Sequence, residues 1–110
     1  MKRPKCTVRL LRIAEDDFSE IVTYIAAENR GAAEMIATKI EKSLIRLSFY
    51  PYLGKIPKDE ELGRLGYRFL VVENYLIFYT IEEQTILIHR IIHGARDYLK
   101  SHATAREFPA

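Results

Sequence analysis

Residues 67–92 read YRFLVVENYLIFYTIEEQTILIHRII, and this stretch decides the fold. Its first part, residues 67–72, alternates between two faces as a β-strand does, with Tyr67, Phe69 and Val71 on one face and Arg68, Leu70 and Val72 on the other. Two short polar interruptions divide the stretch into segments that we expect to form strands at 67–72, 75–81 and 85–92. The last segment is the most apolar, so we expect it to be a central strand buried on both faces. The stretch therefore predicts an antiparallel meander of three strands.

The sequence ahead of this meander predicts one strand and two helices. Residues 5–13 alternate as a strand does, and the acidic run at 15–17 then opens a helix, because carboxylates stabilise the positive end of the helix dipole. Gly31 marks a break where the chain can adopt a positive φ. A second amphipathic helix is expected over about 32–49, and Pro51 ends it.

The expected order is therefore β-α-α-β-β-β, an α+β fold with a helical hairpin packed on one face of a small antiparallel sheet. Residues 51–66 are rich in Pro and Gly and are expected to form a loop. The helices cover only one face, so the other is left partly open as a binding surface. We expect residues 1–110 to form a single domain in which 99–110 are a tail, either a short helix or an arm.

Composition excludes several classes of protein. The net charge is only +2, which argues against a strongly basic nucleic-acid coat protein, and the hydrophobic fraction of 48% is too high for a disordered chain. The single cysteine, Cys6, cannot form an internal disulfide, so we expect a reducing, cytoplasmic compartment. No apolar run approaches the roughly 18 residues of a membrane span, and no signal peptide is expected.

The sequence offers no recognisable catalytic motif or metal site. It has no Gly-rich phosphate loop and no serine in a nucleophile elbow. His89, His93 and His102 are the only histidines, and no cysteine or carboxylate lies at a matching spacing, so we expect neither a metal nor another cofactor.

A basic and aromatic cluster lies at the end of the last expected strand. Arg64 and Arg68 join it if the strands pair as a meander. Such a group suits phosphate contact and base stacking, or an acidic protein partner, and it is also typical of a solvated sheet edge with local ion pairs. The cluster consists of His89, Arg90, His93, Arg96, Tyr98 and Lys100.

Three stretches together resemble the ParE/RelE toxin family of bacterial toxin–antitoxin modules. They are the acidic helix opening at 16–25, the LSFYPYLG helix exit at 47–54, and the strand region from Gly66 to Tyr98. The resemblance spans about residues 7–98, and it implies the same strand and helix order as the periodicity.

RelE-like members of this family cleave messenger RNA in the ribosomal A site, which requires cations for the phosphate and groups that move protons. Of the basic positions that the resemblance maps onto the middle strands, Arg68 matches one, whereas Leu70 and Leu76 occupy the other two. Arg96 matches an arginine that follows the last strand. Because an arginine side chain cannot readily act as a base, this set is depleted for a nuclease.

RelE-like members also use a tyrosine near the carboxyl end, and Tyr98 matches it only with a shift in spacing. His93 occupies a place where related nucleases use a histidine. The resemblance is therefore closer to ParE-like members and plasmid stabilisation proteins, which bind DNA gyrase without being enzymes. A ribosome-dependent messenger RNA endonuclease is the alternative, and a decayed toxin that only binds its antitoxin is the third interpretation.

The resemblance implies two sets of contact residues and two protein partners. The partners are DNA gyrase and a cognate antitoxin, which forms a hetero-oligomer with the toxin; no membrane is involved. Tyr24 and Ile45 are the expected antitoxin contacts. The expected target contacts, which would be catalytic in a nuclease, are Arg68, His93, Arg96 and Tyr98.

Overall fold

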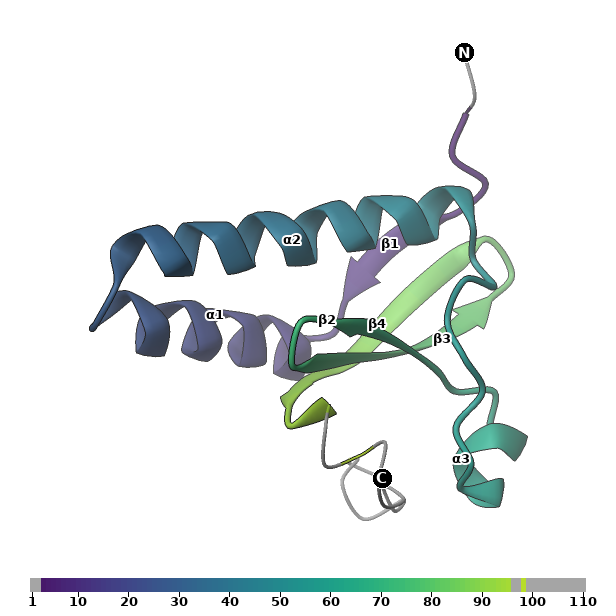
Figure 1. Cartoon of the computed structure of the whole chain (residues 1–110). Coiled ribbons are helices and arrows are strands. Elements are labelled where there is room, and N and C mark those ends of the chain that lie inside the picture. The colour runs from purple at the N-terminus through teal and green to yellow at the C-terminus, as the bar shows by residue number, and fades with distance from the viewer. Residues whose placement is uncertain (1–2, 96–97, 99–110) are drawn as a thin grey trace.

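The computed structural model describes residues 3–95 and residue 98. It confirms the predicted β-α-α-β-β-β order and adds one short helix, α3, inside the segment expected to be a loop. Figure 1 shows α1 and α2 side by side as a hairpin, with α3 at the end of the molecule opposite the turn that joins them. The elements are β1 Thr7–Leu10, α1 Arg12–Ala26, α2 Arg30–Phe49, α3 Glu60–Arg64, β2 Arg68–Val72, β3 Tyr75–Glu82 and β4 Thr85–His93.

The four strands form one sheet in the order β1-β4-β3-β2. β2, β3 and β4 pair as the predicted antiparallel meander. β1, however, pairs in parallel with β4, from Thr7 opposite Thr85 to Leu10 opposite Ile88, so the sheet is mixed rather than antiparallel. Alternation along residues 5–13 indicates a strand but carries no information on its neighbour or direction, which is why this pairing was missed.

β4 is central, as predicted, but it is not buried on both faces. Ile86, Ile88 and Ile91 are buried, whereas the residues between them are partly exposed. β3 is the strand with a continuous buried run, from Leu76 to Thr80. It lies between β2 and β4 and has an apolar cluster on each of its faces.

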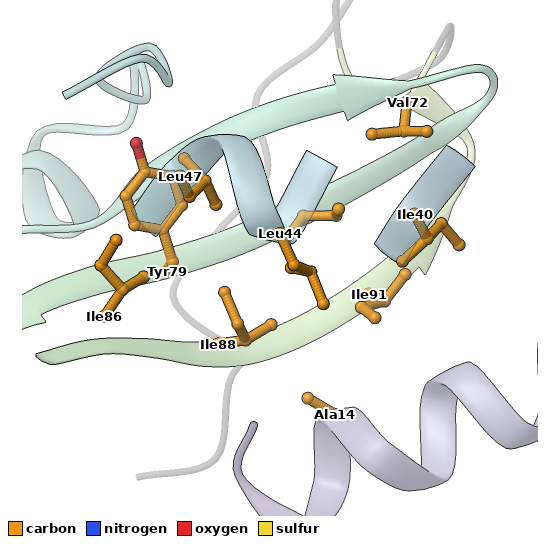
Figure 2. Close-up of a cluster of buried hydrophobic side chains, with 10 residues drawn as sticks. Ala14, Ile40, Leu44, Leu47, Val72, Tyr79, Ile86, Ile88 and Ile91 are labelled. Carbon is orange, nitrogen blue, oxygen red and sulfur yellow. The ribbon is translucent and has the colours of Figure 1, made fainter. Parts of the chain in front are cut away.

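The larger core lies between the sheet and the helical hairpin. In Figure 2, Ile40 and Leu44 of α2 lie over the strands, and Ala14 of α1 points toward β4. This packing removes the apolar faces of both helices from water, at a gain of roughly 25 cal/mol per Å². The buried members are Ala14, Ile40, Leu44, Leu47, Val72, Ile77, Tyr79, Ile86, Ile88 and Ile91.

A smaller cluster covers part of the opposite sheet face, which we call the far face. Leu62 of α3 and Ala95 after β4 are buried against strand residues there. Helix α3 forms because the Asp59 side chain accepts a hydrogen bond from the Leu62 N–H at 3.1 Å. The other buried members are Phe69, Leu76 and Phe78, with Tyr67, Ile92 and Tyr98 packed against them.

Two helix starts differ from the expected positions. α1 begins at Arg12, before the acidic run, and only Glu15 lies in its first turn. α2 begins at Arg30, because the Asn29 side chain accepts a hydrogen bond from the Ala32 N–H at 3.0 Å. Gly31 is therefore helical and does not adopt the positive φ that we expected.

One carboxylate joins α1 to the central strand. Asp17 accepts hydrogen bonds from Arg90 Nε at 2.8 Å, from Arg90 Nη2 at 3.1 Å and from the Ile91 N–H at 3.0 Å. The β1–β4 ladder ends at Leu10 and Ile88, with one further bond from the Leu11 N–H to the Ile88 carbonyl. Asp17 thus satisfies a backbone donor of β4 that lies beyond the reach of β1.

Removing this charge should destabilise the fold. The Asp17 side chain is only 12% exposed, so in Asp17→Asn the partly buried Arg90 loses the negative charge of Asp17, and we expect the free energy of unfolding to fall by about 2–3 kcal/mol. Asp16→Asn is the matched control, because Asp16 is 61% exposed and pairs with Arg12 at 3.5 Å, so its loss should cost under about 0.5 kcal/mol. Equal urea midpoints for the two variants would contradict the proposed role of Asp17.

Candidate functional site

A groove lies at the end of the sheet where β3 begins and β4 finishes. We call it the sheet-end groove, a hollow of about 500 Å³ between this end of the sheet and the helical hairpin. Residues from α1, α2, β2, β3 and β4 line it, and Ile25, Ile36, Tyr75 and His93 contribute much of its wall. Next to it is a second hollow of about 460 Å³, which shares Ile25, Tyr75 and His93 and is bounded by Tyr24.

His93 is held in place inside this groove. Its ring lies edge-on to Tyr75, with centroids 5.2 Å apart, and its Nε2 lies 3.1 Å from Asn74 Nδ2. Because the amide nitrogen of Asn74 is only a donor, His93 Nε2 accepts this bond, which places the proton of a neutral ring on Nδ1. His93 therefore presents an oriented ring to the groove.

Arg68 lies at a different place, beside the loop that follows α2. Its Nη1 donates to the Gly54 carbonyl at 2.9 Å, and its guanidinium lies 5.0 Å from the ring centroid of Tyr52. Along β3, the residue paired with Arg68 is Tyr79, whereas His93 pairs with Tyr75. These two positions are four residues apart, or about 13 Å along a strand.

The loop that Arg68 contacts is fixed by a buried tyrosine. The Tyr79 hydroxyl donates to the Pro51 carbonyl at 2.8 Å and accepts from the Gly54 N–H at 2.9 Å. Burial raises the pKa of Tyr79, although the Gly54 N–H and the charge of Arg68 act against that rise. A Cβ at Gly54 would lie 2.6 Å from the tyrosine oxygen, so only glycine fits here. The loop therefore presents Tyr52, which is 69% exposed, on a rigid base.

Tyr98 lies on the far face rather than in the sheet-end groove. Its ring meets those of Phe69 and Phe78 edge-on, at centroid distances of 5.1 and 5.6 Å. Arg96 lies outside the described residues. The structure therefore does not gather Arg68, His93 and Tyr98 into one patch, and their role in target contact stays a prediction.

The two expected antitoxin contacts are both exposed. Tyr24 is 79% exposed at the margin of the sheet-end groove, and Ile45 is 58% exposed on α2. Ile45 lines neither of the two hollows described above. Within the described part of the chain, no group of His, Cys, Asp and Glu is suited to hold a metal ion. In the same residues, no helix combines the length and apolar character needed to cross a bilayer.

His89 belongs to the basic cluster of the sequence, which predicts no specific role for it, and the structure places it at an irregularity of the sheet. The β3–β4 register shifts between Phe78 and Tyr79, and His89 is the residue of β4 that this irregularity leaves without a strand partner. Its Nε2 lies 2.9 Å from Thr80 Oγ1 and its Nδ1 lies 3.4 Å from the Tyr67 hydroxyl. Burial lowers the pKa of His89, and the charge of Glu82 opposes part of that effect. The periodicity of the sequence gives no sign of such a bulge.

Comparison with known proteins identifies relatives of this chain. The model of the ParE toxin of the type II toxin–antitoxin system, parDE, matches residues 8–98. A solved structure of the chromosomal ParDE toxin–antitoxin system from P. aeruginosa superposes with a TM-score of 0.68 at 18% identity, covering 82% of this chain and 97% of that one. A search of curated proteins finds no match.

A second similar structure is the toxin–antitoxin complex RelBE2 from Mycobacterium tuberculosis. Its TM-score is 0.59 at 26% identity, and the alignment covers 86% of this chain and 97% of that one. The likeness to both structures extends over most of the chain, and it agrees with the element order described above.

The environment of His89 predicts a pH dependence of stability. Because burial lowers its pKa from the ordinary 6.5, the unfolded chain binds a proton more readily than the folded one. The contribution of His89 to the free energy of unfolding should be fully present above about pH 6.5. That free energy should fall as the pH decreases below this value. Urea unfolding between pH 5 and 8 measures this slope, which His89→Gln should flatten. An NMR-measured His89 pKa at or above 6.5 would contradict the prediction.

Proposed function

This chain belongs to the ParE toxin family of type II toxin–antitoxin systems, and from that premise we propose that it inhibits DNA gyrase and is neutralised by a cognate antitoxin. Its place of action is then the cytoplasm, where gyrase meets DNA. The family match over residues 8–98 supports the toxin assignment, and the far face of the sheet supports inhibition rather than RNA cleavage.

The composition of the far face is the observation that carries this choice. RNA cleavage needs a base for the 2′-hydroxyl, cations for the phosphate and an acid for the leaving oxygen. The far face instead buries Phe69, Leu76 and Phe78, with Tyr98 packed across the two phenylalanine rings. The buried members of this cluster carry no cation and no group that moves a proton, so this part of the far face does not supply the chemistry of RNA cleavage.

A messenger RNA endonuclease is the second candidate, and His89 is the feature that favours it. An imidazole whose pKa is lowered by burial is neutral at pH 7 and can accept a proton. The adjacent Tyr67 hydroxyl and the likeness to a RelBE2 complex fit the same chemistry. The contacts of His89 argue against this role, because one ring nitrogen lies beside the Thr80 hydroxyl and the other beside the Tyr67 hydroxyl.

We place the antitoxin on the helix side of the molecule. The two similar structures are toxin–antitoxin systems, and this chain has an apolar groove and an exposed sheet edge at the same end. On the outer edge of β2, Lys55 bridges to Phe69, whereas Val71 is 42% exposed. A helix seated in the groove and an extended segment added beside Val71 would use both features. Tyr24 and Ile45 are the proposed side-chain contacts, and the product is a hetero-oligomer.

Supercoiling of relaxed plasmid by purified gyrase tests the target. We expect the toxin to block supercoiling and to trap cleaved DNA, and we expect the antitoxin to reverse both effects. Ribosome-bound messenger RNA, incubated with the same preparation, should stay intact. Full supercoiling together with cleaved messenger RNA would establish the nuclease instead. If both substrates are unaffected while the antitoxin still binds, the chain is a decayed toxin and the proposed activity is wrong.

A single substitution tests the proposed target contact after β4. Arg96→Ala should weaken gyrase inhibition about tenfold, since a charged hot-spot contact at a protein interface contributes on the order of 1.4 kcal/mol or more. Antitoxin affinity should stay unchanged. Arg12→Ala is the matched control, because the Arg12 side chain is 87% exposed on α1 and has no proposed role. Wild-type inhibition by Arg96→Ala would exclude Arg96 from the target contact.

A further inference from the structure

The hollow beside Tyr24 has the composition of a site for a positively charged side chain. On α1, Glu20 and Tyr24 are four residues apart, as are Ile21 and Ile25, so the two pairs share one side of the helix. Across from them stand Tyr75, the first residue of β3, and His93, the last residue of β4. We call this hollow of about 460 Å³ the aromatic notch.

Three aromatic rings surround the notch. Tyr75 and His93 meet edge-on at 5.2 Å, and Tyr24 is 79% exposed, so its ring faces solvent. Tyr24 and Tyr75 are close enough to interact: the pKa of Tyr75 is raised by burial and, in second place, by the phenol of Tyr24. The faces of such rings carry partial negative charge and attract cations within about 6 Å.

The walls of the notch carry a negatively charged side chain. Among the described residues that line it, Glu20 is the only carboxylate and none is a lysine or an arginine. The floor is apolar, made by Ile21 and Ile25. A cation that enters therefore meets a carboxylate, three rings and an aliphatic base, with no lysine or arginine among the described residues of the walls.

We propose that the aromatic notch receives an arginine side chain of the antitoxin. A guanidinium fits better than an ammonium ion, because its planar group can stack on a tyrosine while its N–H groups donate to the Glu20 carboxylate. The methylene stem then lies along Ile21 and Ile25. The identity of the occupant rests on the proposed antitoxin partnership, whereas the preference for a guanidinium rests on the notch alone.

The first experiment uses a small probe and needs no antitoxin. N-acetyl-arginine amide is titrated into the purified protein while NMR follows the rings of Tyr24, Tyr75 and His93. We expect saturable shifts at millimolar concentrations. N-acetyl-citrulline amide, which has the same shape without the charge, should bind at least tenfold more weakly. Equal binding of the two probes, or no shift of these rings, would overturn the proposed site.

Substitutions at exposed positions show which side chains contribute to binding of the arginine probe. Glu20→Gln and Tyr24→Ala should each lower the affinity for the arginine probe at least fivefold. Tyr24→Phe should keep the affinity of the unsubstituted protein, because the ring remains. Glu41→Gln is the control, since Glu41 is exposed on α2 and lies outside the notch. All four substitutions are at exposed positions, so the fold is retained, and the unfolding midpoint verifies this. Equal effects of Glu20→Gln and Glu41→Gln would contradict the site.

A second experiment tests the occupant. The antitoxin is titrated against the same variants, and Glu20→Gln and Tyr24→Ala should lose at least tenfold in affinity while Glu41→Gln does not. If the arginine probe binds but the antitoxin is insensitive to these substitutions, the antitoxin is not the occupant. The proposed function would survive that result as long as the antitoxin still reverses gyrase inhibition.

Discussion

The carboxylate of Asp17 is the constraint on which the rest of the structure depends. β1 has only four residues, so its parallel ladder with β4 ends at Ile88 and leaves the second half of β4 without a strand on that side. Asp17 takes the place of the missing strand by accepting from the Ile91 N–H, and it pairs with Arg90 at the same time. This one side chain fixes α1 against the end of β4. Because α1 and β4 both line the sheet-end groove and the aromatic notch, the binding surface depends on this side chain.

The same arrangement divides the molecule into two surfaces of different chemistry. The helix side carries a groove with an acidic and aromatic margin, suited to a protein segment with basic residues. The far face carries an aromatic cluster in which Tyr98 packs on Phe69 and Phe78. The groove is the surface that we propose for the antitoxin, whereas Phe69 and Phe78 are buried, at 5% and 0% exposure, and stabilise the far face. Burial of His89 between Thr80 and Tyr67 fits a structural role within this arrangement better than proton transfer.

The sequence predicted the fold well, because the element order follows from periodicity and from residues such as Pro51 that interrupt it. It failed where the outcome depends on tertiary contacts: the parallel pairing of β1, the helix α3 capped by Asp59, and the bulge at His89. For the site, exposure at Tyr24 and Ile45 was anticipated, whereas the separation of Arg68 from His93 was not. Strand register decides whether the residues of one sequence motif lie close together in space, and the pattern of a single sequence does not encode that register.

Direct binding of the target tests the central claim most simply. The fluorescently labelled protein is titrated in parallel with purified DNA gyrase and with ribosomes carrying messenger RNA, and anisotropy reports complex formation. Our account predicts saturable binding to gyrase with a Kd of about 1 µM or below, corresponding to roughly −8 kcal/mol, and no saturation with ribosomes. Saturable binding to ribosomes with none to gyrase would contradict the account and would make the RNA-cleaving alternative the correct one.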